Sequence, residues 1–367
     1  MILPWQNGPR WQIGLHRDDG TRIATLGRVG AFRITHAINN YGAFSMILPA
    51  SFDKSLIQRD RRVRFWRKPV GGAPRIEFEG LIRKWDYATD ASGNLTRVIG
   101  GPSLEYILSS RIVYAASGSA GAAKTDAADD LLKAFAAQEL STGSDAARNL
   151  STAYFTVQGD ASLGPSLTKT CSYGNLLTVM REIVDAARQA DPTKEVFFWI
   201  EPGVGAFQLR TAIGQPGADR TVGNKLVFGV NHGNLQQPRY SENWMEEYNY
   251  AYALGLGEGA ARDVDPASDS RGLATLFARR EATIQHNYAT GGEAAAQSKV
   301  TQGRPVKAFS GKLVSKRGSV YGRDWGKFDR VRVDYDDMQF QALVRSVTID
   351  VAAGGAENIA ATAEAYL

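Results

Sequence analysis

The sequence is poor in cysteine, in histidine and in long apolar runs. Of its 367 residues, one is cysteine and four are histidine. The single Cys171 can form no disulfide within the chain and no thiolate metal site by itself, so packing or partner subunits must supply stability. No stretch approaches the roughly 20 apolar residues of a membrane span, and residues 1–5 show no secretion signal. We therefore expect neither a disulfide framework nor membrane anchoring.

The charges are not gathered in one place. The 43 basic and 38 acidic residues are interspersed and give a net charge of +5. A chain that binds nucleic acid through phosphates usually carries a basic tail or cluster, so this balance does not predict nucleic-acid binding. With 43% hydrophobic residues, the chain has material for a large core and for about two or three domains.

The residues that most often carry chemistry do not form a recognised motif. The histidines are far apart, and none has a helical histidine partner or a nearby pair of cysteines, so no zinc site is expected. They are His16, His36, His232 and His286. Cys171 precedes a predicted helix whose N-terminus could activate a thiol, but a small packed residue is the preferred interpretation.

Two further segments offer weak binding signals. The sequence Gly-Leu-Gly-Glu-Gly at 255–259 lacks the Gly-Lys-Ser/Thr of a phosphate loop and is interpreted as a flexible loop. Asp263, Asp265 and Asp269 could offer oxygens to calcium, but the glycine and terminal glutamate of an EF-hand loop are missing. We expect no catalytic residue, no metal and no cofactor.

Short alternating stretches predict a mainly β fold with an α+β insertion. Residues 1–112 are expected to form a first small β-barrel, with strands at 11–16, 22–26, 31–36, 43–49, 62–67, 76–87 and 94–99. Residues 113–235 are expected to form an α+β middle domain after a linker at 115–123. Its predicted helices are 126–138 and 173–188, and its predicted sheet holds 195–200, 206–210 and 225–230.

Residues 236–367 are expected to form a second β-barrel. A Gly/Asp-rich loop and a short helix, at about 255–302, are predicted as an insertion in it. The predicted strands are 245–254, 306–314, 330–335 and 339–351.

The two ends of the chain carry a repeat. Residues 78–85 and 340–347 share Phe, Leu, a β-branched residue, Arg and a large apolar residue at the same offsets, and each copy follows a Val-Arg strand. Alternating strands can match by chance, which is the alternative interpretation. The preferred interpretation is a duplicated barrel, because two similar domains per chain would let a trimer present six near-equivalent units around an axis.

A basic strand at 59–68 interleaves arginines with aromatics, and it predicts an assembly interface. Such a strand could bind nucleic acid, but arginine and aromatic residues are also enriched at protein interfaces, so a neighbouring subunit is the preferred partner. A solvated edge strand is the alternative. The candidate interface residues, including those in the repeat, are Arg62, Arg64, Trp66, Arg83, Arg332 and Arg345.

Residues 39–49, 78–82, 101–108 and 322–333 resemble the tail hub, or baseplate hub, proteins of long-tailed bacteriophages. This family includes the N-terminal hub portion of tail-associated lysins. The resemblance implies a virion protein, assembled in the host cytoplasm, that forms a homotrimeric ring at the tail tip. It also implies contact with the tail tube or distal tail protein, the tape-measure protein and tail fibre or receptor-binding proteins, with transient passage of phage DNA without specific binding.

The same resemblance implies a structural protein and not an enzyme. The sequence ends at Leu367 with no hydrolase domain behind the second barrel, so another chain is expected to cleave the cell wall. Two alternatives stay open. A virion-associated cell-wall hydrolase could use paired carboxylates among the 38 acids, and a carbohydrate- or receptor-binding module could use the 7 tryptophans and 14 tyrosines.

Overall fold

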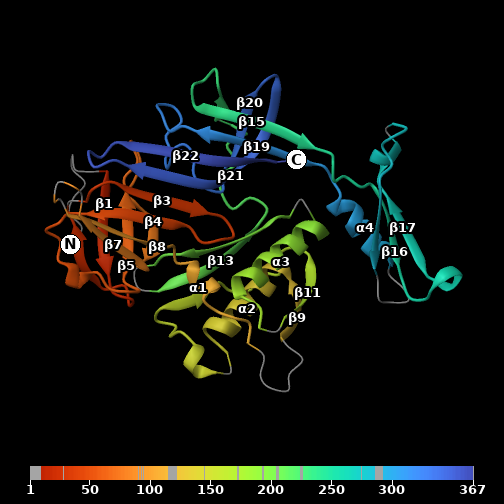
Figure 1. Cartoon of the computed structure of the whole chain (residues 1–367), viewed down its shortest axis with the longest axis horizontal. Helices are drawn as coiled ribbons and strands as arrows, with labels where there is room; N and C mark the ends of the chain where they lie inside the picture. Colours follow the sequence, from red (N-terminus) through yellow and green to blue (C-terminus); the bar gives the residue numbers. More distant parts are fainter. Residues whose placement is uncertain are drawn as a thin grey trace.

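The computed structural model describes most of the chain as a mainly β protein with several sheets (Figure 1). The described residues are 10–27, 29–89, 91, 93, 95–114, 122–143, 145–171, 173–191, 194–203, 206–223, 226–273, 275–285 and 292–366. In the described part of the chain, no helix has both the length and the apolar character needed to cross a membrane.

The N-terminal part consists of short antiparallel strands. They are β1 (Trp11–His16), β2 (Arg22–Leu26), β3 (Phe32–Ala37), β4 (Ala43–Leu48), β5 (Arg62–Arg67), β6 (Arg75–Leu81), β7 (Lys84–Thr89) and β8 (Leu95–Pro102). β1, β2 and β5 have the bounds that the sequence predicts. In β4, Phe44, Met46 and Leu48 are buried and the residues between them are exposed, because successive side chains of a strand point to opposite faces.

The middle part combines helices with a small sheet. Its elements are α1 (Tyr106–Ser109), β9 (Ala122–Ala127), α2 (Ala128–Leu140), β10 (Phe155–Val157), β11 (Ser166–Cys171), α3 (Leu176–Ala190), β12 (Val196–Glu201) and β13 (Phe207–Ile213). The Asn175 side chain caps α3 by accepting from the Thr178 N–H at 3.3 Å. Apolar faces of α2 and α3 share one core with β12 and β13.

One strand was wrongly assigned to the sheet of the middle part, namely residues 225–230. The third strand beside β13 is β10, whereas β14 (Val227–Gly229) pairs in parallel with β20 in another sheet. The alternation of a strand shows which face is apolar, but it does not identify the neighbouring strand.

The C-terminal part begins with β15 (Leu235–Asn243) and continues through β16 (Tyr250–Leu254), β17 (Val264–Ser268), β18 (Glu281–Gln285), α4 (Gly292–Gln302), β19 (Val306–Leu313), β20 (Arg330–Tyr335), β21 (Met338–Val351) and β22 (Glu357–Tyr366). Short 3-10 turns lie at Lys54–Leu56, Ala146–Arg148, Gly259–Ala261 and Ser270–Leu273. The predicted short helix within 255–302 is confirmed as α4.

The predicted Gly/Asp-rich loop is only partly a loop. Its β17 pairs with β16, β18 pairs with the other edge of β16, and α4 covers the sheet. Ala251 and Ala253 of β16 are buried beneath α4, while Tyr250 and Tyr252, which alternate with them, are partly exposed. This unit projects from one side of the molecule (Figure 1).

One large sheet joins the two ends of the chain. Its strand order is β14-β20-β21-β3-β4-β8-β7, with β22 also paired to β21. The junction is antiparallel between β3 and β21, from Ala37 opposite Ser346 to Phe32 opposite Val351. One apolar core contains residues of both ends, including Ile34, Phe65 and Ile349.

This junction corrects the prediction of two separate barrels. Among the described residues, strands of the two ends pair with each other in a shared sheet, and no closed barrel is found at either end. A strand edge is satisfied equally well by any strand with a compatible face, so the sequence pattern alone does not show that each end closes on itself. The domain boundaries at 112 and 235 stay a prediction.

The sequence repeat coincides with two pairs of hairpins that have the same register. In β5–β6, Val63 lies opposite Gly80, and in β20–β21, Val331 lies opposite Ala342. The pairing of β7 with β8 recurs 262 positions later: Lys84 lies opposite Gly100, and Ser346 opposite Thr362. The loop between the first two strands is longer in the first copy, as the sequence indicates.

We expect Ile349→Ala to destabilise both ends together. Ile349 is fully buried in the shared core, so its truncation should lower the free energy of unfolding by about 2–5 kcal/mol. Ile47→Ala, at a 38% exposed position of β4, should cost about 1 kcal/mol or less. Urea unfolding measures the stability, and hydrogen exchange should speed up in β3 as well as in β21. Faster exchange confined to β20–β22 would contradict a shared core.

Candidate assembly site

Two of the predicted interface residues are buried within the chain. Arg62 and Arg64 lie side by side on β5 and share Glu79 of β6, at 2.5 and 2.8 Å from its two carboxylate oxygens. All three side chains are at most 5% exposed. Arg64 also donates to the Gly203 carbonyl at 2.7 Å, which links the first sheet to the middle part. In this chain the pair stabilises the fold, and its role between subunits stays a prediction.

The other four candidates lie in different places. Trp66 is half-buried beside His16, with ring centroids 5.6 Å apart. Arg83 is exposed and pairs with Asp60 at 2.7 Å. Arg332 pairs with Asp334 along β20 at 3.0 Å, and Arg345 reaches across to Glu195 of the middle part at 2.6 Å. The structure therefore does not gather the six into one surface.

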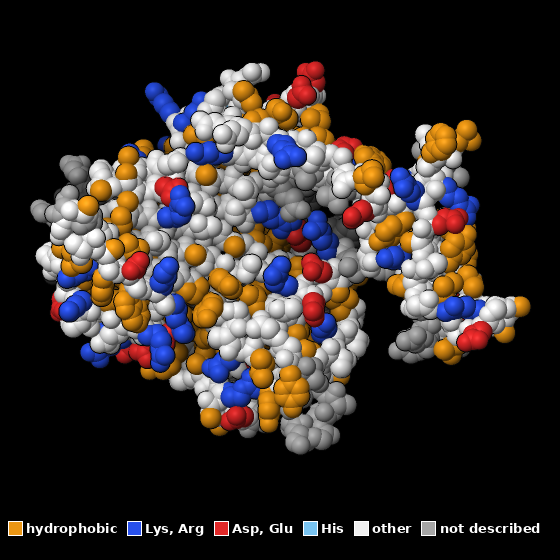
Figure 2. Space-filling view, in the orientation of Figure 1, with side chains coloured by type: hydrophobic (Ala, Val, Ile, Leu, Met, Phe, Trp, Pro, Cys, Tyr) orange, Lys and Arg blue, Asp and Glu red, His pale blue; other side chains and the backbone are white. Residues whose placement is uncertain are grey.

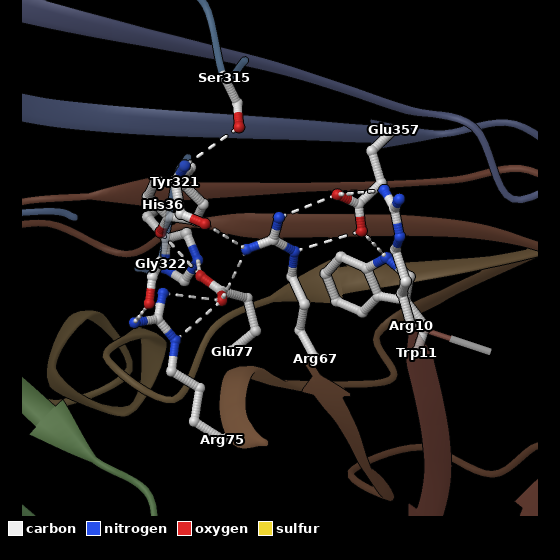
Figure 3. Close-up of polar contacts among 10 residues, drawn as sticks. All are labelled: Arg10, Trp11, His36, Arg67, Arg75, Glu77, Ser315, Tyr321, Gly322 and Glu357. Carbon is white, nitrogen blue, oxygen red and sulfur yellow. Dashed lines mark hydrogen bonds and ion pairs between the residues drawn. The ribbon is translucent and has the colours of Figure 1, made fainter. Parts of the chain in front are cut away.

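A buried polar network that the sequence did not reveal lies where the two ends meet (Figure 3). Glu77 of β6 accepts from the Tyr321 hydroxyl at 2.7 Å and from Arg75 at 3.0 Å, and His36 Nε2 lies 3.5 Å from its carboxylate. Tyr321 and Glu77 are more than 240 positions apart in sequence. The network fixes the loop before β20 against the first sheet.

Arg67 extends this network to the last strand. Its guanidinium bonds to Glu357 at 2.9 Å and to the Tyr321 carbonyl at 3.0 Å, and Glu357 also accepts from the Trp11 indole at 2.7 Å. Arg67 is 2% exposed, so both its charge and that of Glu357 are compensated inside the protein. Figure 3 shows these side chains arriving from β1, β5, β6 and the C-terminal segment.

The network holds its groups in defined charge states. Burial alone would raise the pKa of Glu77, but the neighbouring His36 side chain and the charge of Arg75 outweigh it and hold that pKa well below the usual range. Burial lowers the pKa of His36 and raises the pKa of Tyr321, which also faces the Glu77 charge. At neutral pH Glu77 is thus a carboxylate, while His36 and Tyr321 are uncharged.

A cavity of about 410 Å³ opens beside Glu77. Its wall is built from all three predicted domains, and it includes His36, Arg75, Trp199, Arg220, Tyr321 and Lys327. The five carboxylates on its wall already have partners. Four of them pair with arginines, and these are Glu77, Glu79, Glu201 and Asp329. The fifth, Glu105, accepts from the Ser103 hydroxyl and the Ile200 N–H.

The histidines and Cys171 do not gather at one site in the described residues. His16 and His36 are buried, His232 lies in an exposed turn, and His286 lies outside the described residues. Cys171 ends β11 and packs at the edge of the middle core. Across the described residues, no three His, Cys, Asp or Glu side chains gather as metal ligands would.

The loop segments show the same outcome. Residues 255–259 form a turn between β16 and a 3-10 turn, with Gly257 at φ +99°. Asp269 accepts from the Arg271 backbone N–H at 2.9 Å and pairs with the Arg271 side chain at 3.1 Å. Figure 2 shows basic and acidic side chains interspersed over one face of the molecule, as the sequence predicts.

An exposed strand is the surface feature that the sequence did not single out. All six residues of β7 are exposed, with Trp85 at 45% and Tyr87 at 42%. The alternating pattern of this segment predicted a strand, but only the sheet order places it at an edge. Aromatic side chains on a sheet edge are typical of a binding surface.

Solved structures identify the class of fold. The chain is similar to the prophage MuSo2 43 kDa tail protein from Shewanella oneidensis (14% identity, TM-score 0.58, 96% of this chain and 98% of that chain covered). It is also similar to the tail protein from Neisseria meningitidis MC58 (12%, 0.56, 96% of each) and to prophage tail protein gp18 from Listeria monocytogenes EGD-e (9%, 0.54, 96% and 94%). The fold is that of phage tail proteins.

The family follows from the sequence match. Residues 16–363 match the family described as Siphovirus ReqiPepy6 Gp37-like protein, and the chain belongs to that family. No curated protein matches the chain. The predicted resemblance to phage tail proteins is confirmed.

We expect Glu79→Gln to destabilise the protein strongly. The substitution leaves two buried guanidiniums without their counter-charge, which should lower the free energy of unfolding by about 3–5 kcal/mol. Glu201→Gln is the matched control, because Glu201 pairs with Arg210 at 2.6 Å while both side chains are at least 41% exposed. The control should change stability by about 1 kcal/mol or less. Equal effects in denaturant titrations would refute the structural role of Glu79.

Stability should fall as the pH is lowered from about 6.5 to about 4. Burial and the neighbouring Arg64 charge lower the pKa of His16 from 6.5 to about 4, so in this window the unfolded chain binds a proton that the folded chain does not. The loss should reach roughly 3 kcal/mol for this group. His16→Phe should flatten the dependence measured by thermal unfolding across pH. Part of it should persist, because the pKa of buried His36 is also lowered.

Proposed function

We propose that three copies of this chain form a structural hub ring in a phage tail. The internal duplication is the observation that carries this proposal. Each chain holds two pairs of hairpins of equal register, so three chains supply six near-equivalent units. Because the ring has three chains but six similar units, it could contact a tube with six-fold symmetry on one side and a three-fold assembly on the other. Membership in a siphovirus family and the fold of phage tail proteins support this role.

The ring would sit at the distal tip of the tail and act as a connector. Its partners would be the tail tube or distal tail protein and the end of the tape-measure protein on one side, and fibre or receptor-binding proteins on the other. Phage DNA would pass through its channel without specific binding, and the interspersed surface charges fit such transient contact. Assembly would take place in the host cytoplasm.

The buried carboxylates argue against the hydrolase alternative. A glycosidase of the usual kind needs one carboxyl with a raised pKa to protonate the leaving group. In the 410 Å³ cavity, Glu77 instead has its pKa held well below the usual range, and Glu79 is shared by two arginines. Glu77 is thus held in its ionised form and Glu79 is held by two guanidiniums, which suits a structural network.

We expect the purified chain to have three times the chain mass by native mass spectrometry or light scattering. Negative-stain images should show a ring with a central opening. A monomer or a dimer at every concentration tested would overturn the trimeric hub. Zymography on bacterial cell wall tests the alternative, and clearing by the purified chain would contradict a purely structural role.

A further inference from the structure

Several strands of the described structure have one edge without a paired strand, and β7 and β15 are two of them. β7 pairs only with β8, and β15 pairs only with β19. The residues of β7 are all exposed, and in β15 Arg239, Ser241, Glu242 and Asn243 are exposed. The unpaired N–H and C=O groups of such edges are templates for pairing with another strand.

The hairpin β15–β19 is the C-terminal equivalent of β3–β4. Ala-Phe-Ser occurs at 43–45 in β4 and at 308–310 in β19. The partners correspond as well: Thr35 lies opposite Ala43, and Ser241 lies opposite Ala308. By the same pairing, Ile34 corresponds to Tyr240. In the C-terminal copy of the repeat, β15 therefore occupies the position that β3 occupies in the N-terminal copy.

The junction inside the chain shows how two such units join. There, β21 of the second copy pairs with β3 of the first, with Thr348 opposite Thr35 and Ile349 opposite Ile34. The two threonine hydroxyls face each other at 3.2 Å. β7 occupies the place of β21 in the first copy, since its pairing with β8 recurs 262 positions later as β21–β22.

We infer that β7 of one copy of this chain pairs antiparallel with β15 of a second copy, with Asp86 opposite Ser241 and Tyr87 opposite Tyr240. This register repeats the β21–β3 junction between chains, and it deepens the proposed hub function, on which it rests. The two edges are different surfaces of one chain, so the contact is head-to-tail and closes into a ring when the rotation fits. Figure 1 shows β7 and β15 in separate parts of the molecule.

The side chains on one face of the pair fit burial. Trp85 and Tyr87 hold the positions of Val347 and Ile349, which are buried in the C-terminal copy of the repeat. Trp85 and Tyr87 are themselves 45% and 42% exposed, and the inferred register places them against Tyr240 of the neighbouring chain. The contact would remove from water two aromatic side chains that the single chain leaves exposed.

The other face of the pair fits by charge. In the register above, Asp86 lies diagonally across from Arg239, which holds the position of Arg33. Inside the chain, Arg33 forms an ion pair with Asp350 of β21. Asp350 corresponds to Ala88, so the acidic group has moved by two residues but stays on the same face of the strand. The aromatic face and the charged face of β7 are thus both complementary to β15 of a second chain.

Cysteine cross-linking tests the register. In a Cys171→Ala background, Asp86→Cys and Ser241→Cys are combined and the purified protein is oxidised. We expect bands at two and three times the chain mass on non-reducing gels, which disappear on reduction. Thr35→Cys with Thr348→Cys is the positive control, and it should link within one chain because these hydroxyls are 3.2 Å apart.

A shifted pair separates this register from loose association. Tyr87→Cys with Ser241→Cys differs by one residue, which puts the two thiols on opposite faces of the sheet, so its cross-linking should be at least tenfold weaker. Each single variant should stay unlinked. A trimeric mass without cross-linking of the 86/241 pair, or stronger linking of the shifted pair, would overturn this interface and leave the hub standing. A monomer without cross-links would overturn both.

Discussion

Backbone pairing between β3 and β21 is the constraint on which the rest of the structure depends. It places Phe32–Ala37 beside Ser346–Val351, so the first and last parts of the chain share one sheet and one core. The loops that this pairing brings together enclose charged groups. Arg67, Glu77 and Glu357 would each be unfavourable alone in the interior, and they are tolerated because they meet one another there.

The same junction is the pattern for the contact that we propose between chains. Each copy of the repeat has two strands that can pair across a junction: β3 and β7 in the N-terminal copy, and β15 and β21 in the C-terminal copy. Inside the chain, one such pair is used when β21 meets β3, and the equivalent pair, β7 and β15, is left over. In the proposed ring, these two edges of neighbouring chains would pair, as a closed head-to-tail ring of identical chains requires. The exposed aromatic side chains of β7 would then lie in the interface between two chains.

Local features could be predicted from the sequence because their signals are local. The bounds of β1, β2, β5 and β20 follow from alternation between turn residues, and α3 follows from apolar positions at three- and four-residue spacing. The repeat was also visible, since equal offsets of Phe, Leu and Arg survive in both copies. The Gly/Asp-rich insertion was recognised as a separate segment, but its β17 has too little apolar character to be identified as a strand.

The sequence by itself determined many of the strands, the helices α2, α3 and α4, which of their faces are apolar, and that residues 78–85 and 340–347 share one pattern. Only the tertiary structure decided which strands pair, because any edge with a compatible face can accept a strand. For this reason two barrels were expected where one shared sheet exists, and β14 was assigned to the wrong sheet. The same holds for the charges. The sequence predicted Arg62 and Arg64 as interface residues, but in the structure both pair with Glu79 in the interior. Whether a charged residue can be buried depends on such a partner, which spacing along the chain does not reveal.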